Sequence, residues 1–75
     1  MPFTYNDFRA VLHKSGFLLV RSKKHETWQM ALPDGSILQV RVSHKYGRDI
    51  PTALFHRMLR QASVTREEFV RILKS

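Results

Sequence analysis

Two runs of alternating apolar and polar residues, joined by a turn sequence, place the strongest constraint on how this chain can fold. In the runs 27–32 and 38–43, the apolar positions are Trp28, Met30 and Leu32, followed by Leu38, Val40 and Val42. Pro33, Asp34 and Gly35, between the runs, favour a tight turn. Because successive side chains of a strand point to opposite faces, the pattern predicts two antiparallel strands with one buried face and one open face.

A further strand is predicted at Phe17–Arg21, a short β-prone run separated from residue 27 by the polar stretch Ser22–Glu26. With the two strands above it completes a three-stranded antiparallel meander. If Trp28 points at the helices, three residues of the same strand point away: Thr27, Gln29 and Ala31. Arg41 of the last strand points away by the same alternation. The open face is therefore expected to be polar and partly cationic.

Helix signals precede the strands. Thr4 and Asp7 have the spacing of a helix capping box, and Gly16 can supply the left-handed residue that ends a helix. The apolar residues between these signals recur with helical period: Phe8, Val11 and Leu12. A first helix is therefore predicted over residues 5–14.

Two more helices are predicted after the strands. Ile50-Pro51-Thr52 leads into an apolar stripe with helical spacing: Leu54, Phe55, Met58, Leu59 and Ala62. Thr65 and Glu68 repeat the capping box at the start of a short third helix. The apolar residues of that helix are Phe69, Ile72 and Leu73. The order of elements predicts an α+β fold, with a three-stranded antiparallel sheet covered by helices on one face.

Charge and length limit the classes of function. The 75 residues suffice for one domain, 1–75, and 13 Lys and Arg against 6 Asp and Glu give a formal net charge of +7. This balance favours a polyanionic partner, and RNA is the expected one. No apolar run approaches the ~20 residues that span a bilayer, and no signal-peptide pattern is present. We therefore expect a soluble cytoplasmic protein with no membrane partner, no small-molecule cofactor and, since cysteine is absent, no disulfide.

His25 is the residue that points most directly to chemistry. It lies in the polar stretch between the first two strands, next to Lys23 and Lys24. Counting back from Thr27 places its side chain on the open face, exposed to solvent. Histidine can take or give a proton near neutral pH, so this position suits acid–base catalysis on RNA. From the residues alone, the alternative is a solvated loop histidine without a role.

Further basic residues are candidates for binding RNA phosphates. Lys45 and Arg48 precede a predicted helix, and the free N–H groups at a helix start favour phosphate. His44 lies beside them. They are expected to share one basic surface with four residues of the sheet and its first hairpin: Arg21, Lys23, Lys24 and Arg41. His13 and His56 are expected at the surface, and four histidines on separate elements predict no metal site.

An ordered set of features along nearly the whole chain resembles the HicA family of toxins. The features are the Gly16-Phe17 start of a strand that runs to Val20-Arg21, His25 in the first hairpin, the Pro33-Asp34-Gly35 turn, Val40–His44, and Leu54–Phe69 with Gln61-Ala62 and Arg66-Glu67-Glu68-Phe69. This resemblance implies a double-stranded-RNA-binding-domain-like α-β-β-β-α fold, here with an additional short C-terminal helix. It also implies cleavage of mRNA, neutralisation by a HicB-like antitoxin protein, and a catalytic role for His25. Lys23 and Lys24 depart from the family, which commonly has glycine, often followed by serine, before this histidine.

Cleavage of RNA without a metal ion requires few protein groups, because RNA supplies its own nucleophile, the 2′-hydroxyl. It needs positioning, proton transfer by His25, and stabilisation of charge at phosphorus by Lys23, Lys24 or Lys45. Water or His44 would complete the proton transfers. Two other functions remain open at this level. One is a non-catalytic RNA-binding module with the same surface. The other is an interaction protein whose inhibitory partner docks on Leu19, expected on the open face.

Overall fold

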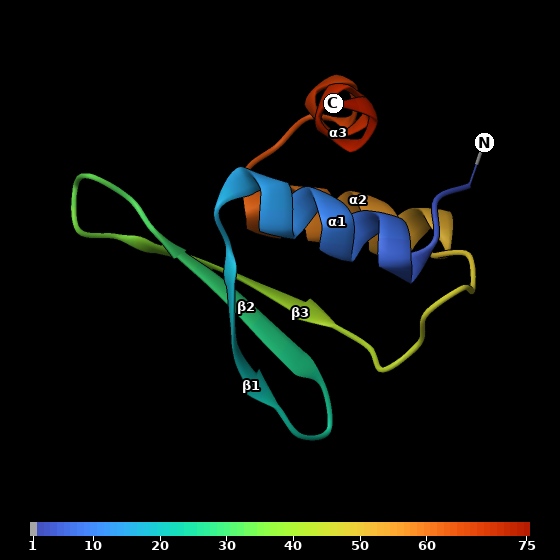
Figure 1. The fold of residues 1–75 in the computed structure, drawn as a ribbon, viewed down its shortest axis with the longest axis horizontal. Coiled ribbons are helices and arrows are strands. Elements are labelled where there is room, and N and C mark those ends of the chain that lie inside the picture. Colours follow the sequence, from blue (N-terminus) through green and yellow to red (C-terminus); the bar gives the residue numbers. More distant parts are fainter. Residues whose placement is uncertain (1) are drawn as a thin grey trace.

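The computed structural model describes residues 2–75, which form three helices and one three-stranded sheet (Figure 1). The elements in chain order are α1 (Tyr5–Ser15), β1 (Leu18–Ser22), β2 (Glu26–Ala31), β3 (Ile37–Val42), α2 (Thr52–Ala62) and α3 (Arg66–Lys74). The strand order is β1-β2-β3, and both neighbouring pairs are antiparallel. The predicted α+β fold, with the order α-β-β-β-α and an additional C-terminal helix, is confirmed.

The helix boundaries follow the predicted capping residues. The Thr4 side chain accepts a hydrogen bond from the Asp7 N–H at 3.1 Å, and the Asp7 carboxylate accepts one from the Thr4 N–H at 2.9 Å. Thr65 and Glu68 form the same reciprocal pair at the start of α3. Gly16 ends α1 with a φ of 99°, in the left-handed region that favours glycine. Each cap satisfies backbone groups that have no partner within the helix.

Phe17 lies outside β1, although the sequence predicted the strand to begin there. Its N–H donates to the Leu12 carbonyl at 2.9 Å, so this residue completes the end of α1. Its ring is only 2% exposed and belongs to the core. The strand starts one residue later, because the backbone of Phe17 is used by the helix cap and its side chain by the core.

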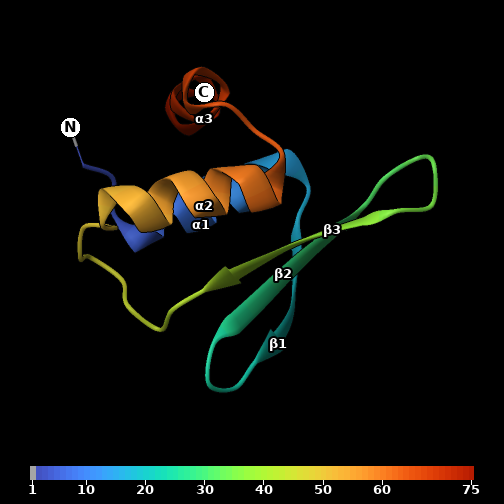
Figure 2. The same ribbon diagram turned by 180° about the vertical axis from the view of Figure 1, so that it is seen from behind.

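The three helices do not share one layer over the sheet. In two opposite views, α1 and α2 lie over one face of the sheet, and α3 lies on the far side of these helices (Figures 1 and 2). Four aromatic rings join the helical layers, with centroid distances from 4.9 to 5.9 Å: Phe3, Phe8, Phe55 and Phe69. The predicted helical cover is therefore provided by α1 and α2, while α3 extends the core away from the sheet.

The register of the sheet decides which side chains face the helices. Val40 lies opposite Trp28 and both are buried, as the alternation predicted. Across β1, Leu19 lies opposite Trp28, and Arg21 lies opposite Thr27, with a bulge at Val20 between them. Leu19 therefore faces the helical side, and its predicted place on the open face is wrong. The bulge is the physical reason, because one extra residue lets Leu19 point inward and Arg21 outward within the same strand.

None of the helices within residues 2–75 is both long and apolar enough to span a bilayer.

Candidate nucleic-acid interface

His25 lies at the end of the β1–β2 hairpin, and its side chain is exposed as predicted. The residue two positions along, Thr27, pairs with Arg21 on one side and Arg41 on the other. These three residues form a row across the open face, one step along the strand from His25. The alternation of β2 thus places the imidazole beside two guanidinium groups from neighbouring strands.

A groove of about 320 Å³ contains His25. Its lining residues come from the hairpin and the open face: Arg21, Lys23, Lys24, His25, Thr27 and Arg41. Four of the six are permanently cationic near neutral pH, and none is acidic. The four cations of the sheet and hairpin therefore line one groove together with His25, as the sequence predicted. Such a concentration of positive charge attracts phosphate groups.

A second groove, of about 290 Å³, continues from the first through His25 and Arg41. Its other wall is α2, which contributes Arg57 and Gln61. The Gln61 side-chain oxygen accepts a hydrogen bond from the backbone N–H of Arg41 at 3.4 Å. This bond links α2 to the outer edge of β3. Sequence analysis gave Arg57 no role. It is exposed, but the packing of α2 on β3 also brings it to the groove of His25.

The open face continues the first groove in the opposite direction. A third hollow is lined by Val20, Arg21, Thr27, Gln29, Gln39 and Arg41. Gln29 donates a hydrogen bond to the side-chain oxygen of Gln39 at 2.7 Å, which links β2 and β3 on this face. The three hollows share lining residues, so a polar path runs from the two glutamines past His25 to α2.

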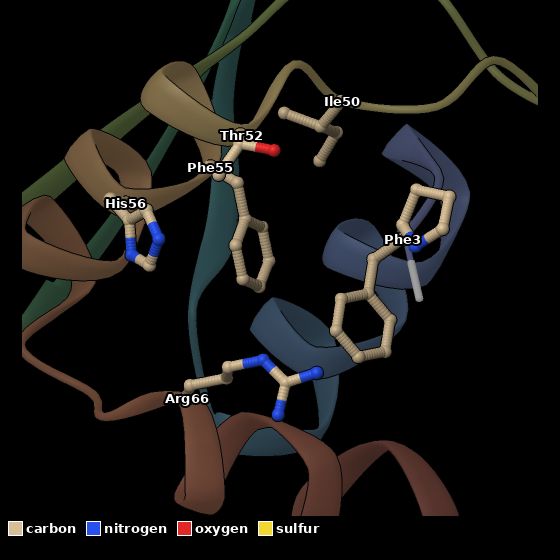
Figure 3. Close-up of a pocket in the computed structure, with 7 residues that line it drawn as sticks. Phe3, Ile50, Thr52, Phe55, His56 and Arg66 are labelled. Atoms are coloured by element: carbon tan, nitrogen blue, oxygen red, sulfur yellow. The ribbon is translucent and has the colours of Figure 1, made fainter.

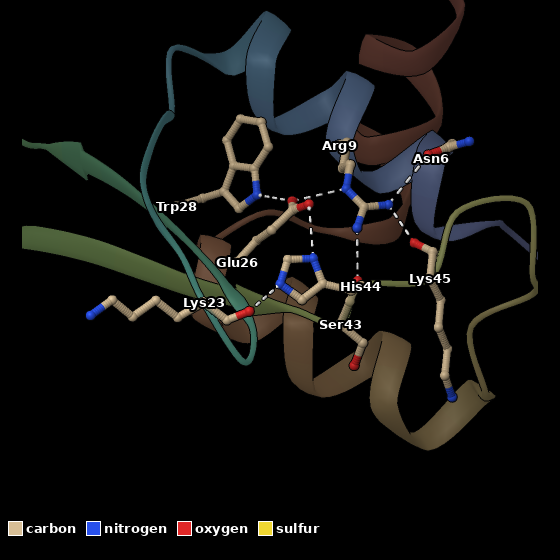
Figure 4. Close-up of polar contacts among 8 residues, drawn as sticks. All are labelled: Asn6, Arg9, Lys23, Glu26, Trp28, Ser43, His44 and Lys45. Carbon is tan, nitrogen blue, oxygen red and sulfur yellow. Dashed lines mark hydrogen bonds and ion pairs between the residues drawn. The ribbon is translucent and has the colours of Figure 1, made fainter.

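Glu26, the residue after His25, is a buried carboxylate with several partners (Figure 4). One of its oxygens accepts hydrogen bonds from Arg9 Nε at 2.9 Å and from Trp28 Nε1 at 3.0 Å. Burial by itself raises the pKa of Glu26, but these hydrogen bonds and the charge of Arg9 more than offset it. The pKa lies below its ordinary value, so the carboxylate is ionised at neutral pH.

Arg9 connects this carboxylate to the segment that follows β3. Its guanidinium donates to the carbonyl of Ser43 at 2.7 Å and to the carbonyl of Lys45, and it lies 4.6 Å from the centre of the Tyr46 ring. Backbone bonds from the start of α1 to the carbonyls of residues 46 and 48 hold the same segment. The loop 43–48 is therefore attached along the first turns of α1.

His44 has protein groups at both ring nitrogens. Its Nε2 lies 2.6 Å from the carbonyl oxygen of Lys23, and its Nδ1 lies 3.8 Å from the second carboxylate oxygen of Glu26. Figure 4 shows the ring between the hairpin and Glu26. Sequence reasoning expected this histidine to help bind an anion. In the structure its polar atoms face the protein's own carbonyl and carboxylate groups.

Lys45 and Arg48 are exposed but are not among the residues that line the grooves of His25. The side chain of Lys45 points away from Lys23 and His44 (Figure 4). The cause lies in the backbone, since the carbonyls of both residues accept hydrogen bonds from α1. The expected single basic surface therefore gathers around His25 without these two residues.

A separate hollow of about 400 Å³ lies in the helical layer (Figure 3). It is lined by Pro2, Phe3, Ile50, Thr52, Phe55, His56 and Arg66. The Arg66 guanidinium lies 5.6 Å from the centre of the Phe3 ring, where the arrangement is that of a cation–π contact. His56 is exposed, as the sequence predicted, and Arg66 is exposed as well. This hollow shares no lining residue with the grooves around His25.

Within residues 2–75, no three His, Cys, Asp or Glu side chains gather in a way that could hold a metal ion. Comparison of the chain with family models, curated proteins and solved structures gave no significant match.

Four residues of the site were missed in the sequence: Arg9, Glu26, Arg57 and Gln61. A signal existed for Glu26, because the alternation that puts Trp28 inside also puts Glu26 inside, and a buried carboxylate requires a cationic partner. No comparable local signal marks Arg9 or Gln61. Their partners lie 17 or more residues away along the chain.

Proposed function

We propose that this chain is an endoribonuclease that cleaves mRNA, with His25 as general acid or base and neighbouring lysines and arginines as phosphate ligands. The observation that carries the proposal is the exposed imidazole in a groove whose lining includes four cationic residues and no acidic one. Nucleases of this kind need a proton-transfer group and positive charge at the same place. The groove offers both.

The cations have distinct positions around the histidine. Arg21 and Arg41 approach from the sheet, and Lys23 and Lys24 precede His25 in the hairpin. Arg57 extends the positive charge onto α2. An RNA strand that follows the polar path would place successive phosphates over these groups, with one phosphate beside His25. Recognition through phosphates alone carries no base preference.

The chemistry proposed at that phosphate uses the RNA as its own nucleophile. His25 removes the proton of a 2′-hydroxyl, the 2′-oxygen bonds to phosphorus, and the bond from phosphorus to the 5′-oxygen breaks. The products are a 2′,3′-cyclic phosphate and a 5′-hydroxyl, the latter formed with a proton from water or from the imidazolium. The neighbouring cations stabilise the extra negative charge on the phosphoryl oxygens in the transition state. Since both nitrogens of His44 face protein atoms, we assign no proton transfer to it.

Replacement of His25 tests the proposal. His25→Ala removes the proton-transfer group and leaves the cations, so cleavage should fall by ~10²- to 10⁴-fold while RNA affinity changes little. Cleavage of a labelled RNA in the presence of a chelator measures the first quantity, and fluorescence anisotropy measures the second. His13→Ala, which removes an exposed histidine of α1, is the control and should cleave normally. Equal turnover of His25→Ala and wild type would eliminate His25 as catalyst.

The same experiment separates catalysis from simple binding. A non-catalytic RNA-binding module would show affinity without cleavage in the wild-type protein as well. In that case the basic groove would serve only to hold RNA.

We also propose that the activity belongs to the toxin of a type II toxin–antitoxin system, that it acts in the cytoplasm, and that a HicB-like antitoxin protein restrains it. The outer edge of the sheet supports a protein partner. All five residues of β1 are exposed, and three consecutive ones are apolar: Leu18 (70%), Leu19 (47%) and Val20 (52%). Within residues 2–75, β1 pairs with β2 alone, so its other edge is free to bind an extended segment.

Leu19 remains the residue to test, although it lies on the helical side of the sheet. Leu19→Glu should weaken binding of the antitoxin-like product of a neighbouring gene at least tenfold, because it places a charge in an apolar contact. Ile37→Glu is the matched control, since Ile37 is 60% exposed but lies on β3. Calorimetric titration with both variants measures the effect. Unchanged affinity of Leu19→Glu, or equal losses in both variants, would contradict docking at β1.

A further inference from the structure

The hairpin that carries His25 has few stabilising interactions among its own residues. Residues 21–25 are all exposed, and the backbone bond across the turn, from the Lys23 N–H to the His25 carbonyl, is long at 3.4 Å. Two adjacent lysines in the turn repel each other and the guanidinium of Arg21 nearby. A catalytic side chain in such a segment needs an anchor from outside the hairpin.

His44 supplies a contact of this kind. Its Nε2 lies 2.6 Å from the carbonyl oxygen of Lys23, which is shorter than the 3.4 Å backbone bond across the turn. A carbonyl oxygen only accepts hydrogen bonds, so Nε2 must carry the proton and donate it. The bond crosses from the end of β3 to the turn, and it fixes the backbone two residues before His25.

The other side of the imidazole ring is also defined. Nδ1 faces the Glu26 carboxylate at 3.8 Å, and that carboxylate is held by Arg9 and Trp28. Arg9 in turn binds the carbonyl of Ser43, directly before His44. The groups at the two ring nitrogens of His44 are therefore the Glu26 carboxylate and the backbone carbonyl of Lys23. They hold the ring in one orientation.

We propose that His44 is a positioning residue for His25, through its hydrogen bond to the Lys23 carbonyl. This inference rests on the proposed nuclease function for its catalytic consequence. Lys23 and Glu26 flank the segment 24–25. His44 holds the Lys23 carbonyl, and Arg9 holds the Glu26 carboxylate. Loss of the Lys23 anchor would leave His25 tethered at one side only. The cations of the groove would remain, since they belong to other residues.

The experiment compares two replacements of His44 with a histidine control. His44→Leu removes the donor, whereas His44→Gln retains an N–H that can reach the Lys23 carbonyl. His13→Leu removes an exposed histidine from α1 instead. Amide hydrogen exchange measured by NMR should speed up at least tenfold in His44→Leu at Lys23, whose N–H donates across the turn to the His25 carbonyl. It should stay closer to the wild-type rate in His44→Gln and be unchanged in His13→Leu.

Kinetics give the second measurement. In His44→Leu, kcat for RNA cleavage should fall by roughly 10- to 100-fold with little change in KM, because misplacement of a catalytic group affects the chemical step. His44→Gln should recover a large part of kcat. Circular dichroism and thermal unfolding confirm that each variant is folded. Should His44→Leu fail to fold, His44→Gln compared with His44→Asn, whose shorter side chain cannot reach the carbonyl, provides the same contrast.

Two results would overturn the inference. One is unchanged exchange of the Lys23 amide in His44→Leu. The other is a rise in KM with kcat preserved, which would mean that His44 binds RNA directly. If the wild-type protein cleaves no RNA, the proposed function fails, while the exchange rates still decide by themselves whether His44 anchors the hairpin.

Discussion

The side chain of Glu26 is both buried and charged. The alternation of β2 directs it to the buried side with Trp28, and its charge then requires partners, which Arg9, Trp28 and His44 provide. His25, one position earlier, points to the opposite face and remains exposed. The exposure of His25 was predictable because strand parity is local. The Glu26 partners Arg9 and His44 were not, because they come from α1 and from the loop after β3.

Replacing Glu26 by glutamine should lower the free energy of unfolding by about 1–3 kcal/mol at pH 7, because the Arg9 guanidinium loses a charged acceptor. The folded-state pKa of Glu26 is lowered, so the charge stabilises the protein above about pH 4.3, the ordinary pKa of glutamate. That contribution is lost as the pH falls through the folded-state pKa. Urea unfolding of both proteins from pH 7 to pH 3 should show the difference shrinking. A constant difference over this range would contradict the role of the charge.

At the level of elements, caps and apolar periods located the first helix and the three strands to within one residue, and they placed two further helices after the sheet. The exceptions have local structural causes. Phe17 joins the cap of α1 instead of β1, and the bulge at Val20 reverses the face of Leu19. A bulge depends on how two strands fit together, so the alternation within one strand does not reveal it.

The capping box of α3 provides a test at this scale. Thr65→Ala removes the hydroxyl that accepts from the Glu68 N–H, leaves the N–H of residue 65 that donates to the Glu68 carboxylate, and should cost about 1 kcal/mol. For a domain of this size, that loss lowers Tm by roughly 4–8 °C. Thr52→Ala is the control, since α2 begins without a side-chain cap and the change should stay within about 0.5 kcal/mol. Thermal unfolding measures both, and equal shifts would show that the cap contributes nothing specific.

For the whole molecule, a net charge of +7 favours a polyanionic partner, but it does not indicate where that partner binds. The fold distributes the cations unevenly. Arg21, Lys23, Lys24 and Arg41 surround His25, and Arg57 joins them from α2. The loop of Lys45 and Arg48 is instead attached to α1. RNA affinity should therefore depend on the groove and much less on the loop.

Salt dependence measures this distribution. With His25→Ala used to prevent cleavage, the logarithm of RNA affinity should fall against the logarithm of salt concentration with a slope of about −3. Each of four groove cations that neutralises a phosphate contributes about −0.7 on a single strand. Replacing Lys23 and Lys24 by alanine should make the slope less steep by about 1.4, and replacing Lys45 and Arg48 should leave it nearly unchanged. Equal effects of the two pairs would contradict a localised groove.

The sequence by itself determined the number, type and order of the elements, the buried face of each element except β1, and the exposure of His25, because caps, turns and alternation act between residues a few positions apart. The tertiary structure decided what lies around that histidine. It brought Arg57 and Gln61 to the groove, turned His44 toward the Lys23 carbonyl, and placed α3 outside the other helices. These outcomes depend on contacts between distant parts of the chain, and such contacts form only when the strands and helices pack together.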